Sequence, residues 1–197
     1  MTTALEWDAK RAALTKPHIE PLTAFVRCVR QERPSENCIP DFDPDDGGIN
    51  AEVLFVLEAP GPKAIATGFV SRDNPDLTAR NLKTYMAEAG IDRNRSLIWN
   101  IVPWYLGDGK TIRAASAVDI RAGSVFLERL LGLLPHLKVI VLVGRKAQAA
   151  SEKGRLTTLL PVYRSAHPSP QWVHRHPDNG EKIREVFREV ALRVNGK

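Results

Sequence analysis

Cysteine is scarce in this chain of 197 residues, which contains only Cys28 and Cys38. Two cysteines outside a C-x-x-C arrangement cannot build a four-cysteine zinc or iron–sulfur site, nor a disulfide framework. Long apolar runs are also missing, and residues 1–8 show no basic region followed by an apolar one, so neither a membrane span nor a secretory signal is indicated. We therefore expect a cytoplasmic protein with no membrane partner, no cofactor and no bound metal.

Acidic side chains are concentrated in one segment. Residues 36–46 carry five carboxylates and no lysine or arginine, so the net charge of +5 divides into −5 here and +10 in the rest of the chain. A basic remainder favours a polyanionic partner such as nucleic acid. The stretch Asp41 to Asn50 is rich in proline, aspartate and glycine, and we expect a mobile, solvated loop rather than a metal site.

Short apolar runs bounded by turn residues predict buried strands at 53–57, 96–102 and 138–143, with a weaker fourth run at 159–163. Between them, apolar residues at helical spacing predict amphipathic helices, one of which begins with Asn74 as its N-cap. This alternation predicts an α/β fold, a three-layer α/β/α sandwich around a mostly parallel four-stranded sheet. The length is that of one domain covering residues 1–197.

Three of these strands finish in polar residues, Glu58, Asn100 and His167, of which Asn100 lies within its apolar run. Because parallel strands bring their C-terminal ends to one edge of a sheet, a carboxylate, an amide and an imidazole should meet in one cleft. For Asn100 alone, two interpretations stay open, a cap on a neighbouring loop and an amide directed at a ligand.

The segments around these residues resemble the uracil-DNA glycosylase superfamily. The similar motifs are Leu57-Glu58-Ala59-Pro60-Gly61, the Asn-Ile-Val-Pro-Trp stretch that begins at Asn100, and His167-Pro168-Ser169-Pro170. Phe69 occupies the expected place in the loop after the first motif, and the resemblance covers about residues 50–190. It is closest to the branch whose first motif reads Gly-Glu-Ala-Pro-Gly.

The chain departs from that branch in three ways. Leu57 replaces the first glycine of the motif, and Ala59 stands where the best-known branch has a water-activating aspartate. The branch with the Glu motif usually holds an iron–sulfur cluster on four cysteines, which this chain lacks.

The resemblance implies a monofunctional, monomeric repair enzyme that flips uracil out of single- or double-stranded DNA and hydrolyses its N-glycosidic bond. His167 would donate to uracil O2 as negative charge develops there, and Glu58 would orient water or stabilise the sugar cation. Uracil would be bound by Ala59, by Phe69 stacking on the ring, and by Asn100 reading its edge. Contacts with DNA would come from Pro60, Gly61, Lys63, Ser169, Trp172 and Arg175, with Trp172 filling the gap in the duplex as a wedge.

Two other classes remain open on the sequence. One is a DNA-binding protein of the same fold without turnover, for which Leu57 and Ala59 are the strongest argument. The other is a hydrolase of small nucleosides or nucleotides, for which the basic surface would be incidental.

Overall fold

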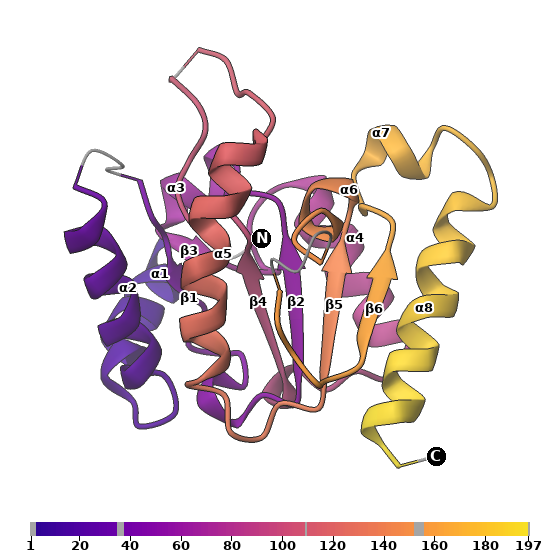
Figure 1. The fold of residues 1–197 in the computed structure, drawn as a ribbon, viewed down its shortest axis with the longest axis horizontal. Helices are drawn as coiled ribbons and strands as arrows, with labels where there is room; N and C mark the ends of the chain where they lie inside the picture. Colours follow the sequence, from indigo (N-terminus) through magenta and orange to yellow (C-terminus); the bar gives the residue numbers. More distant parts are fainter. Residues whose placement is uncertain (1–2, 35–37, 109, 152–155, 197) are drawn as a thin grey trace.

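The centre of the structure, a computed structural model that describes residues 3–34, 38–108, 110–151 and 156–196, is a parallel sheet (Figure 1). Its strand order is β4-β2-β5-β6, with β2 at Val53–Leu57, β4 at Ser96–Asn100, β5 at Val139–Val143 and β6 at Val162–Ser165. The inner strands β2 and β5 are continuous apolar runs because helices cover both of their faces.

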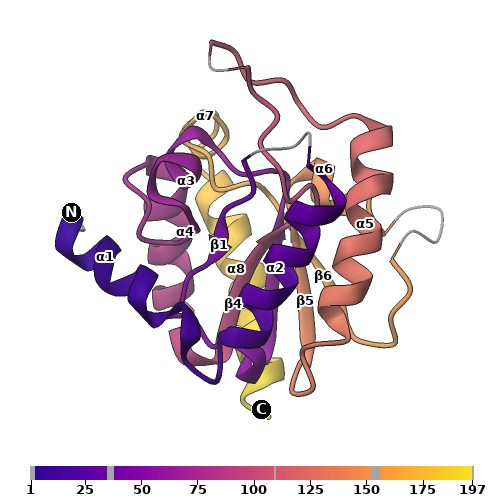
Figure 2. The same cartoon turned by 90° about the vertical axis from the view of Figure 1, so that its left-hand side faces the viewer.

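Helices form a layer on each side of this sheet (Figure 2). On one side lie α2 (Glu20–Glu32) and α5 (Ala117–Leu131), and on the other α4 (Leu77–Glu88) and α8 (Asn179–Val194). Aromatic pairs mark the two interfaces: Phe55 of β2 meets Phe187 of α8 with ring centroids 5.1 Å apart, and Trp99 of β4 meets Phe25 of α2 at 6.0 Å. The predicted three-layer α/β architecture is confirmed.

Shorter elements surround the sandwich. The strands β1 (Asp41–Phe42) and β3 (Phe69–Val70) form a separate parallel pair. The remaining helices and 3₁₀ turns are α1 (Ala4–Ala12), η1 (Ala13–Thr15), η2 (Gly48–Asn50), α3 (Pro62–Thr67), η3 (Arg93–Arg95), α6 (Arg145–Gln148) and α7 (Pro170–Val173). Across the described ranges, no helix combines the length and the apolar character that a membrane crossing requires.

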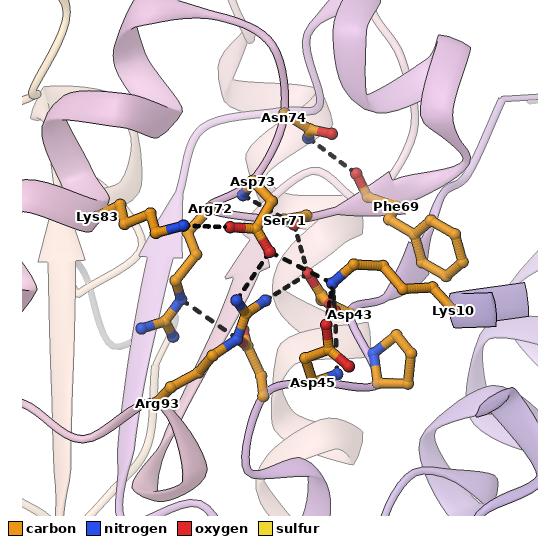
Figure 3. A network of polar contacts seen from close by, with 12 residues as sticks. Lys10, Asp43, Asp45, Phe69, Ser71, Arg72, Asp73, Asn74, Lys83 and Arg93 are labelled. Atoms are coloured by element: carbon orange, nitrogen blue, oxygen red, sulfur yellow. Dashed lines mark hydrogen bonds and ion pairs between the residues drawn. The ribbon is translucent and has the colours of Figure 1, made fainter. Parts of the chain in front are cut away.

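The expectation of a solvated loop at Asp41–Asn50 is wrong for two of its carboxylates. Asp43 and Asp46 are 1% and 2% exposed, and both take part in a network of ion pairs (Figure 3). Lys10 Nζ lies 2.6 Å from Asp43 Oδ1, and Arg93 donates to both aspartates at 2.8 and 3.0 Å. Buried carboxylates need such partners, and these come from segments far away in the sequence.

Two predicted boundaries are also wrong. Asp76 rather than Asn74 caps α4, because the Asp76 carboxylate accepts from the backbone N–H of Ala79 at 2.9 Å. The fourth strand begins at Val162 rather than 159, and Leu159 is fully exposed. β6 is an edge strand with one neighbour, so it can contain polar residues such as Arg164 and Ser165. A search for apolar runs therefore places this strand too early in the chain.

Candidate functional site

A cavity of about 330 Å³ opens at the C-terminal ends of β2 and β4. Its wall consists of the end of β2 and the following turn into α3, the segment from Val70 into α4, residues of β4 itself, and His167 after β6. The polar side chains on this wall are Lys63, Ser71, Asn74, Asp76, Thr78, Asn100 and His167. The cavity thus occupies the sheet edge at which parallel α/β folds bind ligands.

A groove of about 840 Å³ adjoins the cavity, and His167 lines both. The rest of its lining includes Glu58, Gly144, Gln148, Ser165, Ser169 and Trp172, together with the cations Arg145, Lys146 and Arg164. Three cations against one carboxylate make this surface suitable for a phosphate backbone.

Asn100 is the last residue of β4, where it is paired in register with Leu57 of β2. It is 4% exposed and lines the cavity. Among the residues that the structure describes, none makes a hydrogen bond to its side-chain amide. A buried amide normally has a partner, so this arrangement favours the ligand-directed interpretation of Asn100 over a loop cap.

His167 is held in a defined tautomer. The backbone N–H of Ser169 donates to Nδ1 at 3.2 Å, which leaves Nε2 to carry the proton. Burial lowers the pKa of His167, although the negative charge of Glu58 acts in the opposite direction, so the ring is a neutral N–H donor at pH 7.

Gly144 gives this ring its space. Its φ is +84°, and a Cβ at this position would lie 3.1 Å from His167 Cβ and Cδ2. Only glycine combines the left-handed conformation with such a close approach. The end of β5 and the start of α6 can therefore pack directly against the imidazole.

Glu58 follows β2, but its carboxylate belongs to the groove rather than to the Asn100 cavity. Its Oε1 accepts from the backbone N–H of Ala115 at 2.6 Å, and its carbonyl oxygen accepts from Val102 N–H at 3.0 Å. The expected meeting of three polar groups in one cleft is thus divided between two neighbouring hollows. Asn100 shares the cavity with His167, and Glu58 shares the groove with it.

Phe69 does not reach the cavity. Its ring is 1% exposed and stacks on Trp7 of α1, with centroids 5.8 Å apart and 17° between the planes. In this structure Phe69 serves the packing of α1, and Val70 and Ser71 form the wall at that point. Burial and stacking on another aromatic ring both stabilise the Phe69 side chain, which accounts for its position away from the cavity.

The other residues implied by the resemblance lie around the two hollows. Ala59, Pro60, Gly61 and Lys63 line the cavity, and Ser169 and Trp172 line the groove. Arg175 lines neither of them and is an exposed residue just after α7.

Sequence reasoning missed several residues at the site. Arg145 and Lys146 directly follow the glycine that ends β5, a position that could have indicated anion contacts. Ser71 and Asn74 had no such signal, because they look like ordinary turn residues.

The buried ion-pair network is connected to the cavity wall through Ser71 and Asn74, which Figure 3 shows beside the network and which line the cavity. Ser71 donates from its hydroxyl to Asp43, and the Asn74 amide donates to the Phe69 carbonyl at 3.0 Å. Arg93 binds Asp73 at 2.7 Å, and Asp73 lies between Ser71 and Asn74 in the chain. The segment between β3 and α4 is therefore held by charges that do not themselves line the cavity.

The cysteines do not fit the iron–sulfur cluster found in the Glu-motif branch. Cys28 is exposed on α2 and Cys38 precedes β1, so two of the four thiolates have no candidate. In the part of the chain that is described, no group of three or more His, Cys, Asp or Glu side chains is arranged to hold a metal ion.

Residues 44–191 match the family model of the uracil DNA glycosylase superfamily. A comparison with curated proteins found no match. The matched range covers well over half of the chain and includes the motifs at Glu58, Asn100 and His167. It supports a function of the DNA glycosylase type, that of a repair hydrolase with a DNA substrate. The chain belongs to the uracil-DNA glycosylase superfamily.

Proposed function

We propose that this protein excises uracil from DNA and leaves an abasic site. The observation that carries the proposal is that Asn100 and His167 line one cavity with complementary unused groups. The Asn100 amide has no hydrogen-bond partner in the described chain, and Nε2 of His167 is its proton-bearing nitrogen. One donor and one acceptor on Asn100 match O4 and N3–H of uracil, and the imidazole N–H matches O2.

A uracil stacked in DNA must be flipped out before it can enter such a cavity. The basic groove next to His167 would hold the sugar-phosphate backbone, and Trp172 would fill the space left in the stack. Lys63 and the backbone of Gly61 at the cavity mouth would contact the phosphates near the flipped nucleotide.

The chemical step breaks the bond between C1′ of the sugar and N1 of uracil. The electron pair leaves with the base, whose O2 becomes negative and accepts a hydrogen bond from His167 Nε2–H. The sugar becomes cationic, and a water molecule adds to C1′ while its proton passes to Glu58. Because Glu58 lies on the groove side of His167, it would act at the sugar rather than at the base.

The first experiment uses uracil-containing oligonucleotides, single- and double-stranded, followed by alkali to cut abasic sites. We expect cleavage at the uracil position in both, and none in matched thymine oligonucleotides. Binding without cleavage would instead identify a DNA-binding member of the fold, for which Leu57 and Ala59 argue. Turnover of free nucleosides without dependence on DNA would identify a small-molecule hydrolase.

Asn100→Asp tests whether the proposed site reads the base. Cytosine offers an amino donor and an N3 acceptor on this edge, so the asparagine amide faces it donor to donor, at roughly 1–3 kcal/mol for each unpaired buried group. Removing the side-chain donor should abolish uracil excision, with at most a trace of cytosine excision. Asn94→Asp makes the same chemical change at an exposed position and should behave like the parent. A folded Asn100→Asp protein with the parent uracil rate would show that this residue does not select the base.

A further inference from the structure

The carboxylate of Glu58 has an asymmetric environment. Oε1 accepts the backbone N–H of Ala115 at 2.6 Å, whereas no hydrogen bond to Oε2 is formed within the described residues. Glu58 also lines the groove. A carboxylate anchored through one oxygen presents the other in a fixed direction, which is what a group that orients water requires.

Ala115, which provides this anchor, is completely buried although it lies in the connection between β4 and α5. The chain on both sides of Ala115 is fixed, at Arg113 before it and at Ser116 after it. Arg113 binds the two Asp119 carboxylate oxygens at 2.6 and 3.0 Å, and the Ser116 N–H donates to Asp119 at 2.8 Å in the capping box of α5. The position of the Ala115 N–H is thus tied to the start of a long helix.

Lys146 fixes the same residue from the opposite side. Its ammonium group, on the short helix α6, donates to the carbonyl oxygen of Ala115. Holding a lysine side chain in one conformation costs rotamer entropy. The half-buried Lys146 ammonium accepts this cost and binds one particular loop carbonyl, so the contact is specific. Gly144, the N-cap of the same helix, packs on His167, so α6 touches the surroundings of both proposed catalytic groups.

We propose that Lys146 is a positioning residue, which acts through Ala115 to hold Glu58 with Oε1 bound and Oε2 free toward the sugar. This inference rests on the proposed function, because it gives Glu58 its task in hydrolysis. Loss of the Lys146 contact frees Ala115 on one side, so the carboxylate samples other orientations and the proton of the attacking water is accepted less efficiently. At saturating protein this effect appears in the rate of the bound complex, separately from any loss of phosphate attraction in the groove.

Lys146→Met keeps the length and apolar stem of the side chain and removes its ammonium group. At saturating protein, we expect the single-turnover rate of uracil excision to fall by ~10-fold to ~100-fold, in the range that misplaced catalytic groups produce. Because Lys146 is also one of the groove cations, DNA binding should weaken as well, and saturating protein keeps that loss out of the single-turnover rate. Lys146→Arg, which retains a cationic donor, should recover most of the loss.

Two comparisons separate positioning from general damage. Lys138→Met removes one lysine charge at the start of β5, at the other end of the sheet, and should leave the rate unchanged. In a Glu58→Ala background there is no carboxylate to position, so adding Lys146→Met should have little further effect on the rate. Full additivity of the two losses would overturn the proposal.

Hydrogen exchange at the Ala115 amide provides a readout that needs no activity. The amide should be protected in the parent and in Lys138→Met, and should exchange faster in both Glu58→Ala and Lys146→Met. A parent that removes no uracil would refute the proposed function while this measurement still tests the contact. If Lys146→Met keeps both the parent rate and the Ala115 protection, Lys146 does not position Glu58.

Discussion

Asn81 of α4 donates a hydrogen bond from its side-chain amide to the carbonyl oxygen of Pro168, 2.9 Å away and 87 positions later in the chain. Pro168 directly follows His167, and Pro168 and Pro170 both restrict the backbone there. The bond therefore connects the segment that carries the imidazole to a helix on one face of the sheet. It makes Asn81 a support of the site that no motif in the sequence marks.

Asn81→Leu should slow uracil excision by about 5-fold with little change in DNA affinity, since removing one neutral hydrogen bond costs about 1 kcal/mol. The variant keeps the ring N–H of His167 as a donor but removes a restraint on the position of the ring. Single-turnover rates measure the effect, and Thr84→Val on the exposed side of the same helix is the control. An unchanged rate would mean that the prolines alone hold the imidazole in place.

His167→Ala should lower the excision rate more than Glu58→Gln does. The imidazole N–H meets the charge that develops on the leaving base, and losing one such donor typically costs ~10²–10³ in rate. Glutamine at position 58 can still accept the Ala115 N–H, so part of that geometry persists. Single-turnover rates on one uracil oligonucleotide decide between the two roles, which would be reversed if Glu58→Gln were inactive and His167→Ala nearly normal.

Trp172→Ala should reduce excision from duplex DNA much more than from single strands. A wedge matters only where the flipped base leaves a stack and an unpaired partner remains. Trp172 lines the groove but also packs partly against the core, so the alternative is a purely structural role. Equal losses on both substrates, together with a lower thermal midpoint, would support that alternative.

Asp46→Asn should change the pH dependence of stability. Burial raises the pKa of Asp46 from 3.8 to about 7, against the opposing effect of Arg72 and Arg93. The folded state therefore binds this proton more tightly than the unfolded state, so the contribution to stability is full below pH 3.8 and is lost as pH rises toward about 7. The asparagine variant has no such loss, so its free energy of unfolding relative to the parent should rise over this range. Urea titrations of both proteins test this, and parallel curves would contradict it.

Much of the fold could be predicted from local patterns. The runs at 53–57 and 138–143 are apolar because both faces of these strands are covered, and such runs are visible without knowing the partners. The rule that parallel strands end at one edge then correctly brought Asn100 and His167 into one cavity.

The fold class, the order of the strands and helices along the chain, and the residue types available for chemistry could be read from local patterns, because these depend on neighbours along the chain. Which side chains meet depends instead on the three-dimensional packing of the chain. It buried Asp43 against Lys10, 33 positions away, and turned Phe69 toward Trp7. It also set Glu58 on Ala115, 57 positions later, in the groove beside the cavity. Such pairs depend on long-range packing and on the burial of charge, and no local pattern encodes either of them.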